Sequence, residues 1–289
     1  MNVLITGAGG QIGRALAAAA PPGVRISAPA RADLDITRSD SVQRLVRAEA
    51  PDLILNAAGY TAVDRAEAEP DQAAAVNEGG ARHLAEAAAA VGARMLHYST
   101  DYVFDGAERR PYTPGDSPSP INVYGSTKLA GERAVLAVLG NRAVVVRTAW
   151  VYAVHGHNFL RTMLRLLNER DKVKVVADQI GTPTSAASAA WAAWAIAARD
   201  DIHGVLHWTD DGTASWFDFA AAINDEAVVA GILKRPVEIV PVTSVDYPTP
   251  ARRPPFSVLD CSGARAALGQ IPDHWRVALR RTVAEVAGD

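Results

Sequence analysis

The sequence has only one cysteine, Cys261, among its 289 residues. A disulfide within the chain is therefore excluded, and the scarcity of cysteine favours a reducing compartment. The chain also lacks any run of about 20 apolar residues, the length that a membrane-spanning helix requires. No basic segment typical of a secretion signal follows Met1. We therefore expect a cytoplasmic protein with no membrane partner.

The sequence has little net charge, because 29 Lys and Arg residues against 32 Asp and Glu residues give only −3. A nearly neutral chain has no electrostatic bias toward polyanions, so we expect no nucleic-acid partner. Hydrophobic residues make up 49% of the chain, and its length suffices for one large domain or two smaller ones. A soluble globular protein with a substantial core is expected.

Short apolar segments alternate with helical patterns over the first 150 residues. The expected strands cover residues 3–6, 24–28, 53–56, 94–99 and 143–148. Helices are expected between them, including one from Ser39 to Glu49 and one that Pro70 opens and that runs to Val91. Such alternation predicts an α/β fold of the Rossmann type, a doubly wound parallel sheet with helices on both faces. Ligands then bind at the carboxyl ends of the strands.

The pattern loosens beyond residue 150. Helices are expected over residues 159–169, 185–198, 217–230 and 274–287, and the proline-rich residues 241–255 predict an extended loop. We predict a dinucleotide-binding domain formed by residues 1–150 and about 185–205. Residues from about 151 to 184 and 206 to 289 are expected to form a smaller α/β substrate-binding lobe.

A glycine-rich segment lies between the first expected strand and the first helix. It reads Gly-Ala-Gly-Gly-Gln-Ile-Gly over residues 7–13. Glycines permit a tight turn and the close approach of a pyrophosphate to backbone N–H groups at a helix start. This context predicts a dinucleotide site. Its expected contacts are Gly7, Gly10, Gln11, Ile12 and Gly13.

The residues after the second strand bear on the choice of cofactor. Arg31 would pair with the 2′-phosphate of NADPH, whereas Asp33 or Asp35 would favour NADH by binding ribose hydroxyls. The sequence favours NADPH and leaves NADH open. Arg31, Asp35 and Ile36 are therefore expected cofactor contacts.

Tyr124 and Lys128 stand four residues apart on an expected helix, so both side chains share one face. Reduction of a ketone leaves an alkoxide that needs a proton, and a phenol can supply it. Free tyrosine has a pKa near 10, and a cation about 4 Å away would lower it by about three units. This spacing predicts Tyr124 as acid and Lys128 as the cation that lowers its pKa.

Hydroxyl groups gather at the end of the fourth strand, in Tyr98, Ser99 and Thr100. This strand end lies at the same edge of the sheet as the glycine segment. One of these hydroxyls can donate a hydrogen bond to a substrate carbonyl as negative charge develops on it.

Six further segments carry motifs of a known family. They are NAAGYTAVD (56–64), STDYVFDG (99–106), NVYG (122–125), RTAWVY (147–152), DQIGTPT (178–184) and YPTPARRP (247–254). With the glycine segment, they make the chain resemble the extended short-chain dehydrogenase/reductase family over nearly its whole length, and within it the reductases of nucleotide sugars.

The resemblance implies roles for individual residues. It implies that the catalytic hydroxyl is Thr100, with Tyr124 as acid and Lys128 binding the nicotinamide ribose. The cofactor would also contact Ala58, Gly59, Tyr60 and Thr61. The substrate would contact Val63, Thr100, Asp101, Tyr102 and Trp150. The implied reaction is reduction of the C4 ketone of dTDP-4-dehydro-β-L-rhamnose, a dTDP-linked 4-keto-6-deoxy sugar, to dTDP-L-rhamnose for polysaccharide biosynthesis.

The resemblance also implies that some members of the family form dimers bridged by Mg²⁺. Glutamates bind this ion, and one of them is on the first helix. This chain has Arg14-Ala15-Leu16 there, so we expect no metal and a monomer or weak homodimer. His155 and His157 lack neighbouring cysteines or clustered carboxylates and are expected to be polar loop residues. Arg252 and Arg253 could bind a diphosphate or serve a structural role.

Two alternatives stay open. A nucleotide-sugar epimerase or dehydratase shares the expected fold and the Tyr-Lys pair. Resemblance to a dehydratase would imply a Thr-Asp-Glu sequence where this chain has Thr100-Asp101-Tyr102. A non-catalytic NADP-binding regulatory subunit, similar to that of methionine adenosyltransferase, would also share the fold. The presence of Thr100, Tyr124 and Lys128 favours an enzyme.

Overall fold

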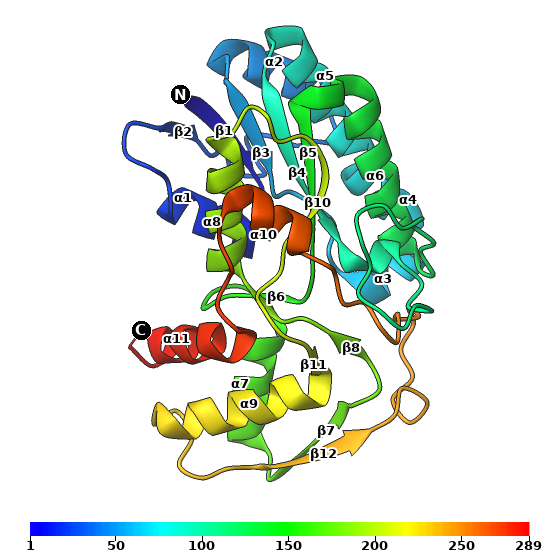
Figure 1. The fold of residues 1–289 in the computed structure, drawn as a ribbon, viewed down its shortest axis with the longest axis vertical. Helices are drawn as coiled ribbons and strands as arrows, with labels where there is room; N and C mark the ends of the chain where they lie inside the picture. The colour runs from blue at the N-terminus through cyan, green and yellow to red at the C-terminus, as the bar shows by residue number, and fades with distance from the viewer. Residues whose placement is uncertain (289) are drawn as a thin grey trace.

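A six-stranded parallel sheet forms the centre of the molecule (Figure 1). The structure is a computed structural model that describes residues 1–288. The strand order is β10-β5-β4-β3-β1-β2. The strands are β1 (Asn2–Thr6), β2 (Arg25–Ser27), β3 (Leu53–Asn56), β4 (Arg94–Thr100), β5 (Ala143–Thr148) and β10 (Gly204–His207). The expected α/β class and parallel sheet are confirmed, and β10 extends the sheet beyond the five expected strands.

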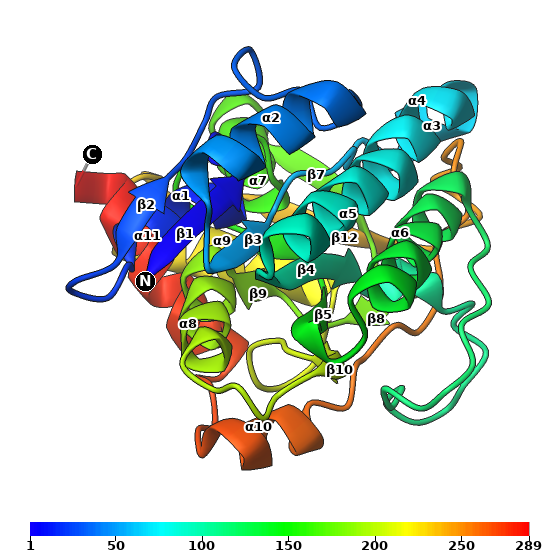
Figure 2. The same cartoon turned by 90° about the horizontal axis from the view of Figure 1, so that it is seen from above.

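Helices cover both faces of this sheet, as the view from above shows (Figure 2). One face packs against α2 (Ser39–Glu49), α5 (Ala81–Val91) and α6 (Val123–Leu139), and the other against α1 (Gln11–Ala18), α8 (Ala186–Ala197) and α10 (Ser262–Leu268). Successive strand residues point to opposite faces. Leu4 therefore packs in the core beneath α2, α5 and α6, whereas Val3 and Ile5 pack in the core beneath α1, α8 and α10. Both faces of the strands are buried, as the apolar segments predicted.

The strand β1 lies between β2 and β3, so the chain reverses its direction of winding around β1. In open α/β sheets, ligands bind at the carboxyl ends of strands where this reversal occurs. The glycine segment follows β1 and residues 57–62 follow β3. The topology thus brings these two segments together at one edge of the sheet.

The helical run expected from Pro70 to Val91 contains a π-helical segment. It consists of α4 (Pro70–Ala74), the π segment η1 (Ala75–Gly80) and α5. A short helix α3 (Val63–Ala68) precedes it. A π segment inserts an extra residue into a helix and is frequent at functional sites. Here it turns Asn77 inward, where the side chain is 1% exposed.

A separate core, called the second core below, lies beyond the carboxyl edge of the sheet (Figure 1). It contains α7 (Phe159–Glu169), α9 (Trp216–Val229), α11 (Trp275–Gly288) and the parallel pair β7 (Lys172–Val176) with β12 (Glu238–Val242). The expectation of a loop from residue 241 is wrong for its first two residues, because Pro241 and Val242 pair with β7. Short strands connect the parts: β6 (Val151–Tyr152), β8 (Ile180–Gly181), β9 (Thr184–Ser185) and β11 (Ala214–Ser215).

The division of the chain into a dinucleotide-binding domain and a substrate-binding lobe stays a proposal. In the structure, β10 runs to His207, and Ala264 of α10 packs into the core beneath the parallel sheet. Within residues 1–288, no helix combines the length and the apolar character needed to cross a membrane.

Candidate active site

At two positions of the glycine segment, neighbouring backbone atoms lie so close that no residue other than glycine fits. Gly7 has a φ of +71°, and a Cβ there would lie 2.5 Å from the Ala58 nitrogen. A Cβ on Gly13 would lie 2.2 Å from the carbonyl oxygen of Gly7. A Cβ on Gly9, in contrast, would meet no atom within 4 Å among the described residues. The segment is therefore tight toward the protein and open on the side where a phosphate would approach.

The first turn of α1 presents backbone N–H groups. Its cap residue, Gly10, is extended and has no side chain to bond them. The side chain of Gln11 points elsewhere, because its Oε1 accepts a hydrogen bond of 2.9 Å from Asn158. A pyrophosphate would thus meet backbone N–H groups at Gln11 and Ile12 rather than the Gln11 side chain.

The residues after β2 differ in exposure. Arg31 is exposed, whereas Ile36 is buried. Asp35 accepts hydrogen bonds from the Thr37 N–H at 3.0 Å and the Thr37 hydroxyl at 2.8 Å, and these bonds lower the pKa of its carboxyl. Because the Asp35 carboxylate is engaged with its own turn, Arg31 has the freer side chain toward a cofactor.

Asn56 joins the carboxyl ends of three strands. Its Oδ1 accepts from the Thr6 hydroxyl at 2.7 Å and from the Ala58 N–H at 3.1 Å, and its Nδ2 lies 2.9 Å from His97 Nδ1. Burial and the nearby Lys128 charge hold the pKa of His97 well below its usual value, so this ring is neutral. The network fixes the start of residues 57–62 beside the glycine segment.

Asn77, which the sequence analysis missed, holds the far end of this loop. Its Oδ1 accepts from the Tyr60 N–H at 2.8 Å, and its Nδ2 donates to the Tyr60 carbonyl at 3.1 Å and to the Thr127 hydroxyl at 3.0 Å. A Cβ on Gly131 would lie 2.1 Å from the Asn77 carbonyl, so this glycine allows α6 to approach. No sequence signal singled out Asn77, because the same helical segment carries other polar residues such as Gln72 and Glu78.

The start of α6 is held by its cap residue and by a close contact with the segment that follows β4. Asn122 caps the helix by accepting from the Gly125 N–H at 2.7 Å and donates to the Arg252 carbonyl at 2.8 Å. A Cβ on Gly125 would lie 2.1 Å from the Tyr102 carbonyl. These contacts seat the first turn of α6, which carries Tyr124, directly on the segment that follows β4.

Tyr124 packs edge-on against Tyr102, with ring centroids 5.8 Å apart. Burial raises the pKa of Tyr124 to about 12, a hydrogen bond with Thr100 opposes this rise, and the Asp101 charge adds to it. The phenol therefore stays protonated near neutral pH, which is the form that can donate a proton.

Lys128 is 5% exposed, and its ammonium donates a hydrogen bond to the Tyr98 carbonyl. Burial lowers the pKa of Lys128 to about 8. Burial opposes the charged form of each group, and the role of Lys128 in lowering the pKa of Tyr124 stays a prediction. A Cβ on Gly59 would lie 3.9 Å from Lys128 Nζ, which places the loop after β3 beside this ammonium.

Thr100 and Asp101 complete this group at the end of β4. The Thr100 hydroxyl donates to Asp101 Oδ1 at 3.0 Å and accepts from the Tyr102 N–H at 3.2 Å. The structure thus brings Thr100, Asp101, Tyr102 and Tyr124 into one cluster at the edge of the sheet.

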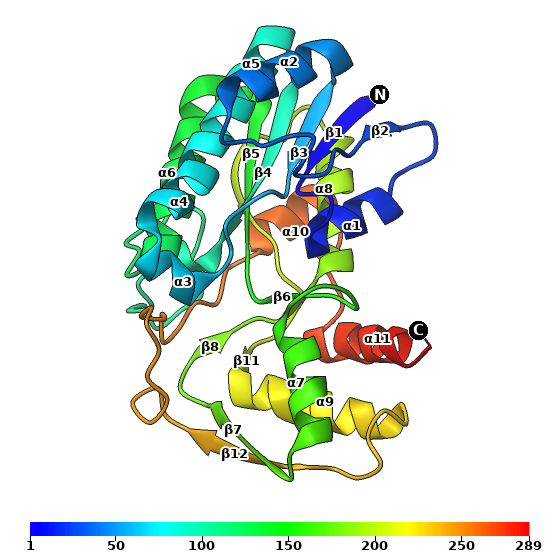
Figure 3. The ribbon, with the colours of Figure 1, turned by 180° about the vertical axis from the view of Figure 1, so that it is seen from behind.

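The two remaining expected substrate contacts, Val63 and Trp150, lie at the start of α3 and between β5 and β6. Val63 begins α3, next to Asp64, whose carboxylate accepts two hydrogen bonds from Arg253 at 2.9 and 2.8 Å. Figures 1 and 3 both show the segment around Arg253 against α3. Arg253 therefore has a structural contact.

Trp150 has a strained φ of +46° and stacks on Trp216 with centroids 3.6 Å apart. A Cβ on Gly181 would lie 2.6 Å from the Trp150 ring. The indole of Trp150 is therefore held between these two residues, and it joins the segment after β5 to the second core.

A buried ion pair lies behind the cluster. Arg147 donates to Glu132 at 2.7 Å, and both side chains are almost fully buried. Ser99 donates to the same carboxylate, and the Glu132 charge favours the charged form of Lys128. The pair fixes α6 against β5, so it supports the placement of Lys128.

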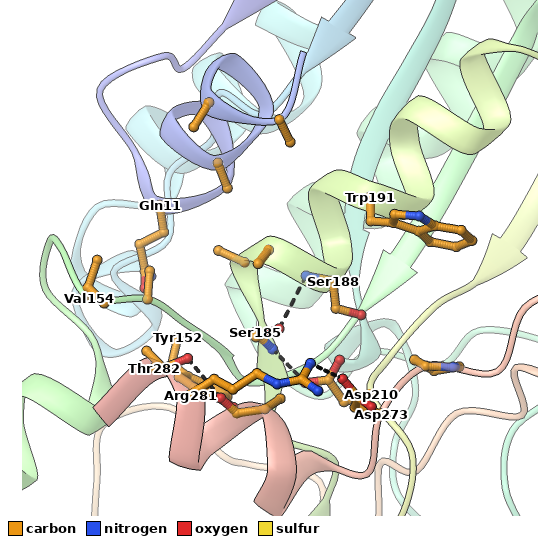
Figure 4. A pocket seen from close by; sticks show the side chains of 18 of the residues that line it. Gln11, Tyr152, Val154, Ser185, Ser188, Trp191, Asp210, Asp273, Arg281 and Thr282 are labelled. Carbon is orange, nitrogen blue, oxygen red and sulfur yellow. Dashed lines mark hydrogen bonds and ion pairs between the residues drawn. The ribbon is translucent and has the colours of Figure 1, made fainter. Parts of the chain in front are cut away.

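A cavity of about 760 Å³ lies elsewhere, between α1, α8 and α11 (Figure 4). Its lining includes Gln11, Tyr152, Trp191 and Asp210 but none of Thr100, Tyr124 and Lys128. Burial raises the pKa of Asp210 to about 6. Among residues 1–288, no group of three or more His, Cys, Asp or Glu side chains could hold a metal ion.

Comparisons with known proteins agree with one another. A model of the family described as "RmlD substrate binding domain" matches residues 1–287. The dTDP-4-dehydrorhamnose reductase of Sinorhizobium fredii is 43% identical, and the match covers 98% of this chain and 97% of that protein. The dTDP-4-dehydrorhamnose reductase of Escherichia coli K12 is 40% identical, with 99% and 98% covered.

Solved structures lead to the same group. A dTDP-4-dehydrorhamnose reductase of Clostridium acetobutylicum has a TM-score of 0.93 and 38% identity, with 99% of each chain covered. That of Bacillus anthracis, in complex with NADP, has a TM-score of 0.93 and 37% identity, with 98% of this chain and 99% of that chain covered. The chain therefore belongs to the dTDP-4-dehydrorhamnose reductase family.

Proposed function

We propose that this protein reduces the C4 ketone of dTDP-4-dehydro-β-L-rhamnose with NADPH and so forms dTDP-L-rhamnose. The observation that carries the proposal is the cluster of Thr100, Asp101, Tyr102 and Tyr124, with Lys128 one helical turn beyond Tyr124. The names of the relatives support the substrate, and the NADP complex of the Bacillus anthracis protein supports the cofactor.

The residues at the edge of the sheet fit a dinucleotide. Gly7 and Gly13 leave no room for a Cβ, and the side of Gly9 is open. We assign the cofactor contacts to Gly7, Gly10, Gln11, Ile12, Gly13, Arg31, Asp35, Ile36, Ala58, Gly59, Tyr60, Thr61, Tyr124 and Lys128. When bound, NADPH supplies the hydride that adds to the sugar C4. The exposed guanidinium of Arg31 suits the 2′-phosphate and makes NADPH the preferred form.

The protein's own groups handle the negative charge and the proton. The ketone oxygen gains negative charge as hydride adds to C4. Tyr124 donates its phenol proton to this oxygen, and Thr100 donates a hydrogen bond to it. Lys128 would bind the cofactor ribose, and its charge would favour the phenolate that Tyr124 becomes on losing its proton. We assign substrate contacts to Val63, Thr100, Asp101, Tyr102 and Trp150.

We further propose that the enzyme acts in the cytoplasm, as a monomer or weak homodimer, in the synthesis of a deoxysugar for surface polysaccharides. The presence of Arg14 on α1 argues against a metal-bridged dimer. Its guanidinium donates to the Gly9 carbonyl at 3.1 Å and provides no carboxylate for a cation.

A coupled assay tests the function. The enzymes that make dTDP-4-keto-6-deoxyhexoses supply the substrate, NADPH absorbance is followed, and NMR identifies the product. We expect one NADPH to be oxidised for each sugar reduced. Epimerases and dehydratases recycle their cofactor, so a product that retains the ketone without net NADPH oxidation would overturn the proposal.

A further inference from the structure

The hydroxyl of Thr100 has one hydrogen, and the protein already uses it. That hydrogen is donated to Asp101 Oδ1 at 3.0 Å. One lone pair of the same oxygen accepts from the Tyr102 N–H at 3.2 Å, and Tyr124 lies beside this hydroxyl. A hydroxyl has one donor and two acceptor positions. In this arrangement Thr100 has no hydrogen left for a substrate ketone.

Two features show that the arrangement around Asp101 can change. The side chain is 2% exposed, and among residues 1–288 its Oδ2 has no hydrogen-bond partner. A buried carboxylate with one unpaired oxygen is costly, whereas the neutral acid is not. Thr100 and Asp101 are adjacent and both rigidly held, so a proton gained by Asp101 changes the bond between them without moving the backbone.

We propose that Asp101 is a positioning residue whose protonation turns the Thr100 hydroxyl from the carboxylate toward the substrate ketone. The proposal rests on the proposed function and adds a switch to it. With a proton on Oδ1, Asp101 donates to the Thr100 oxygen. Thr100 then directs its own hydrogen at the ketone oxygen. This bond uses the second lone pair of the Thr100 oxygen, because the first accepts from the Tyr102 N–H.

The proton balance closes within these groups. Tyr124 loses the proton that the sugar oxygen gains, and hydride from the cofactor forms the new C–H bond at C4. Asp101 keeps its proton throughout, and Thr100 keeps its own. A neutral Asp101 also removes a negative charge that would repel the oxygen on which charge develops.

The electrostatic surroundings support this switch. Burial raises the pKa of Asp101 to about 6, and the nearby Ser257 hydroxyl and the hydrogen bond from Thr100 partly oppose this rise. Tyr102 on the following turn and Tyr124 on α6 are the titratable groups that face it, and both remain neutral because burial raises the pKa of each. Beyond Tyr102 stand Asp64 of α3 and Arg253 of the C-terminal segment, which neutralise each other as an ion pair.

The pH dependence of kcat/KM tests the proposal in three forms of the enzyme. In the wild type we expect a rise of about tenfold from pH 7 to pH 5, since one group with a pKa near 6 must be protonated. In Asp101→Asn the amide donates to Thr100 at every pH, so the rise with falling pH disappears, whatever the level of activity. In Thr100→Val, activity falls and the rise also disappears, because Asp101 acts only through the hydroxyl.

Three results would overturn it. The first is a wild-type profile without the rise. The second is a rise that persists in Thr100→Val. The third is a rise that persists in Asp101→Asn.

A second measurement does not depend on turnover. Carboxyl ¹³C NMR of the free protein should show Asp101 titrating near pH 6, and Thr100→Val should raise its pKa because a stabilising hydrogen bond is lost. An Asp101 resonance that titrates near the ordinary value of 3.8 would overturn the switch even if the reductase assay fails. Failure of that assay alone, with the NMR shift present, would instead overturn the substrate.

Discussion

The side chain of Asn77 donates a hydrogen bond of 3.0 Å to the hydroxyl of Thr127, the residue that precedes Lys128. Through its two bonds to Tyr60, the same amide holds the loop after β3. One side chain on a π-helical turn therefore aligns two segments assigned to the cofactor.

Replacement of Asn77 by alanine should weaken cofactor binding more than the chemical step. Loss of the amide leaves the Tyr60 N–H and carbonyl without their partner, so residues 59–61 lose their fixed position. We expect the KM for NADPH to rise about tenfold, which corresponds to about 1.4 kcal/mol, and kcat to change less. Steady-state kinetics at saturating sugar measures this split.

Asn224→Ala is the matched control for Asn77. Asn224 is also a buried asparagine that bonds backbone, but it does so with Val237 in the second core. It should lower stability and leave the KM for NADPH unchanged. An equal rise of KM in both variants would show that the effect is general loosening of the fold.

Tyr124→Phe should retain NADPH binding and lose turnover by at least about a hundredfold, the scale of acid catalysis. The ring keeps its contact with Tyr102, so the fold is preserved. Cofactor titration by fluorescence and single-turnover reduction separate the two effects. Turnover equal to that of the wild type would remove Tyr124 from the chemistry.

Affinity for NADPH should fall as pH rises through about 8. Burial lowers the pKa of Lys128 from 10.5 to about 8, so its ammonium is charged below this pH and neutral above it. A neutral amine has no charge to attract the cofactor. Binding should therefore be strongest below pH 8, and titration calorimetry from pH 7 to pH 9 measures the slope.

Lys128→Met should bind weakly at every pH and remove the slope. Lys174→Met is the control, because Lys174 is exposed on β7 and its loss should leave the slope intact. A slope that survives in Lys128→Met belongs to another group.

Gly13→Ala should destabilise the protein, whereas Gly9→Ala should not. The new Cβ at position 13 would lie 2.2 Å from the Gly7 carbonyl, and that at position 9 meets no described atom within 4 Å. Overpacking of this kind costs about 1–3 kcal/mol. Urea denaturation of both variants measures the difference, and equal stability would mean that the turn relaxes freely.

Arg31→Ala should shift cofactor preference from NADPH toward NADH. The guanidinium is the exposed cation after β2, and Asp35 is bound to Thr37. We expect the ratio of kcat/KM values for the two cofactors to change by about tenfold, the effect of one charged contact to a phosphate. Arg25→Ala on the exposed side of β2 should change neither value, and an unchanged ratio in Arg31→Ala would assign the 2′-phosphate elsewhere.

Local patterns predicted much of the first 150 residues. The strands Leu53–Asn56 and Ala143–Thr148 and the helix Ser39–Glu49 lie where apolar runs and cap signals put them. The strand β10 was missed because Gly204–His207 is short and is recognised as a strand only through its pairing with β5. Pairing between strands that are distant in sequence cannot be recognised from a short segment of a few residues.

The chemistry of the cluster was less accessible from sequence. Spacing placed Tyr124 and Lys128 on one helical face, but the direction of their pKa shifts depends on burial, which only the packing of α6 on β4 determines. The stacking of Trp150 on Trp216 and the bond from Asn77 to Thr127 join residues at least 50 positions apart. Neither contact follows from a motif.

The cap of the catalytic helix has a consequence for the order in which the protein is made. Asn122 bonds the carbonyl of Arg252, 130 residues later, and Asp64 bonds Arg253, 189 residues later. While the chain emerges from the ribosome, these partners arrive near the end of synthesis, long after the parallel strands β1 to β5 have been released. The strands β1 to β5 are therefore available to pair first, and α6, which carries Tyr124, receives its final support only when the last segment is in place.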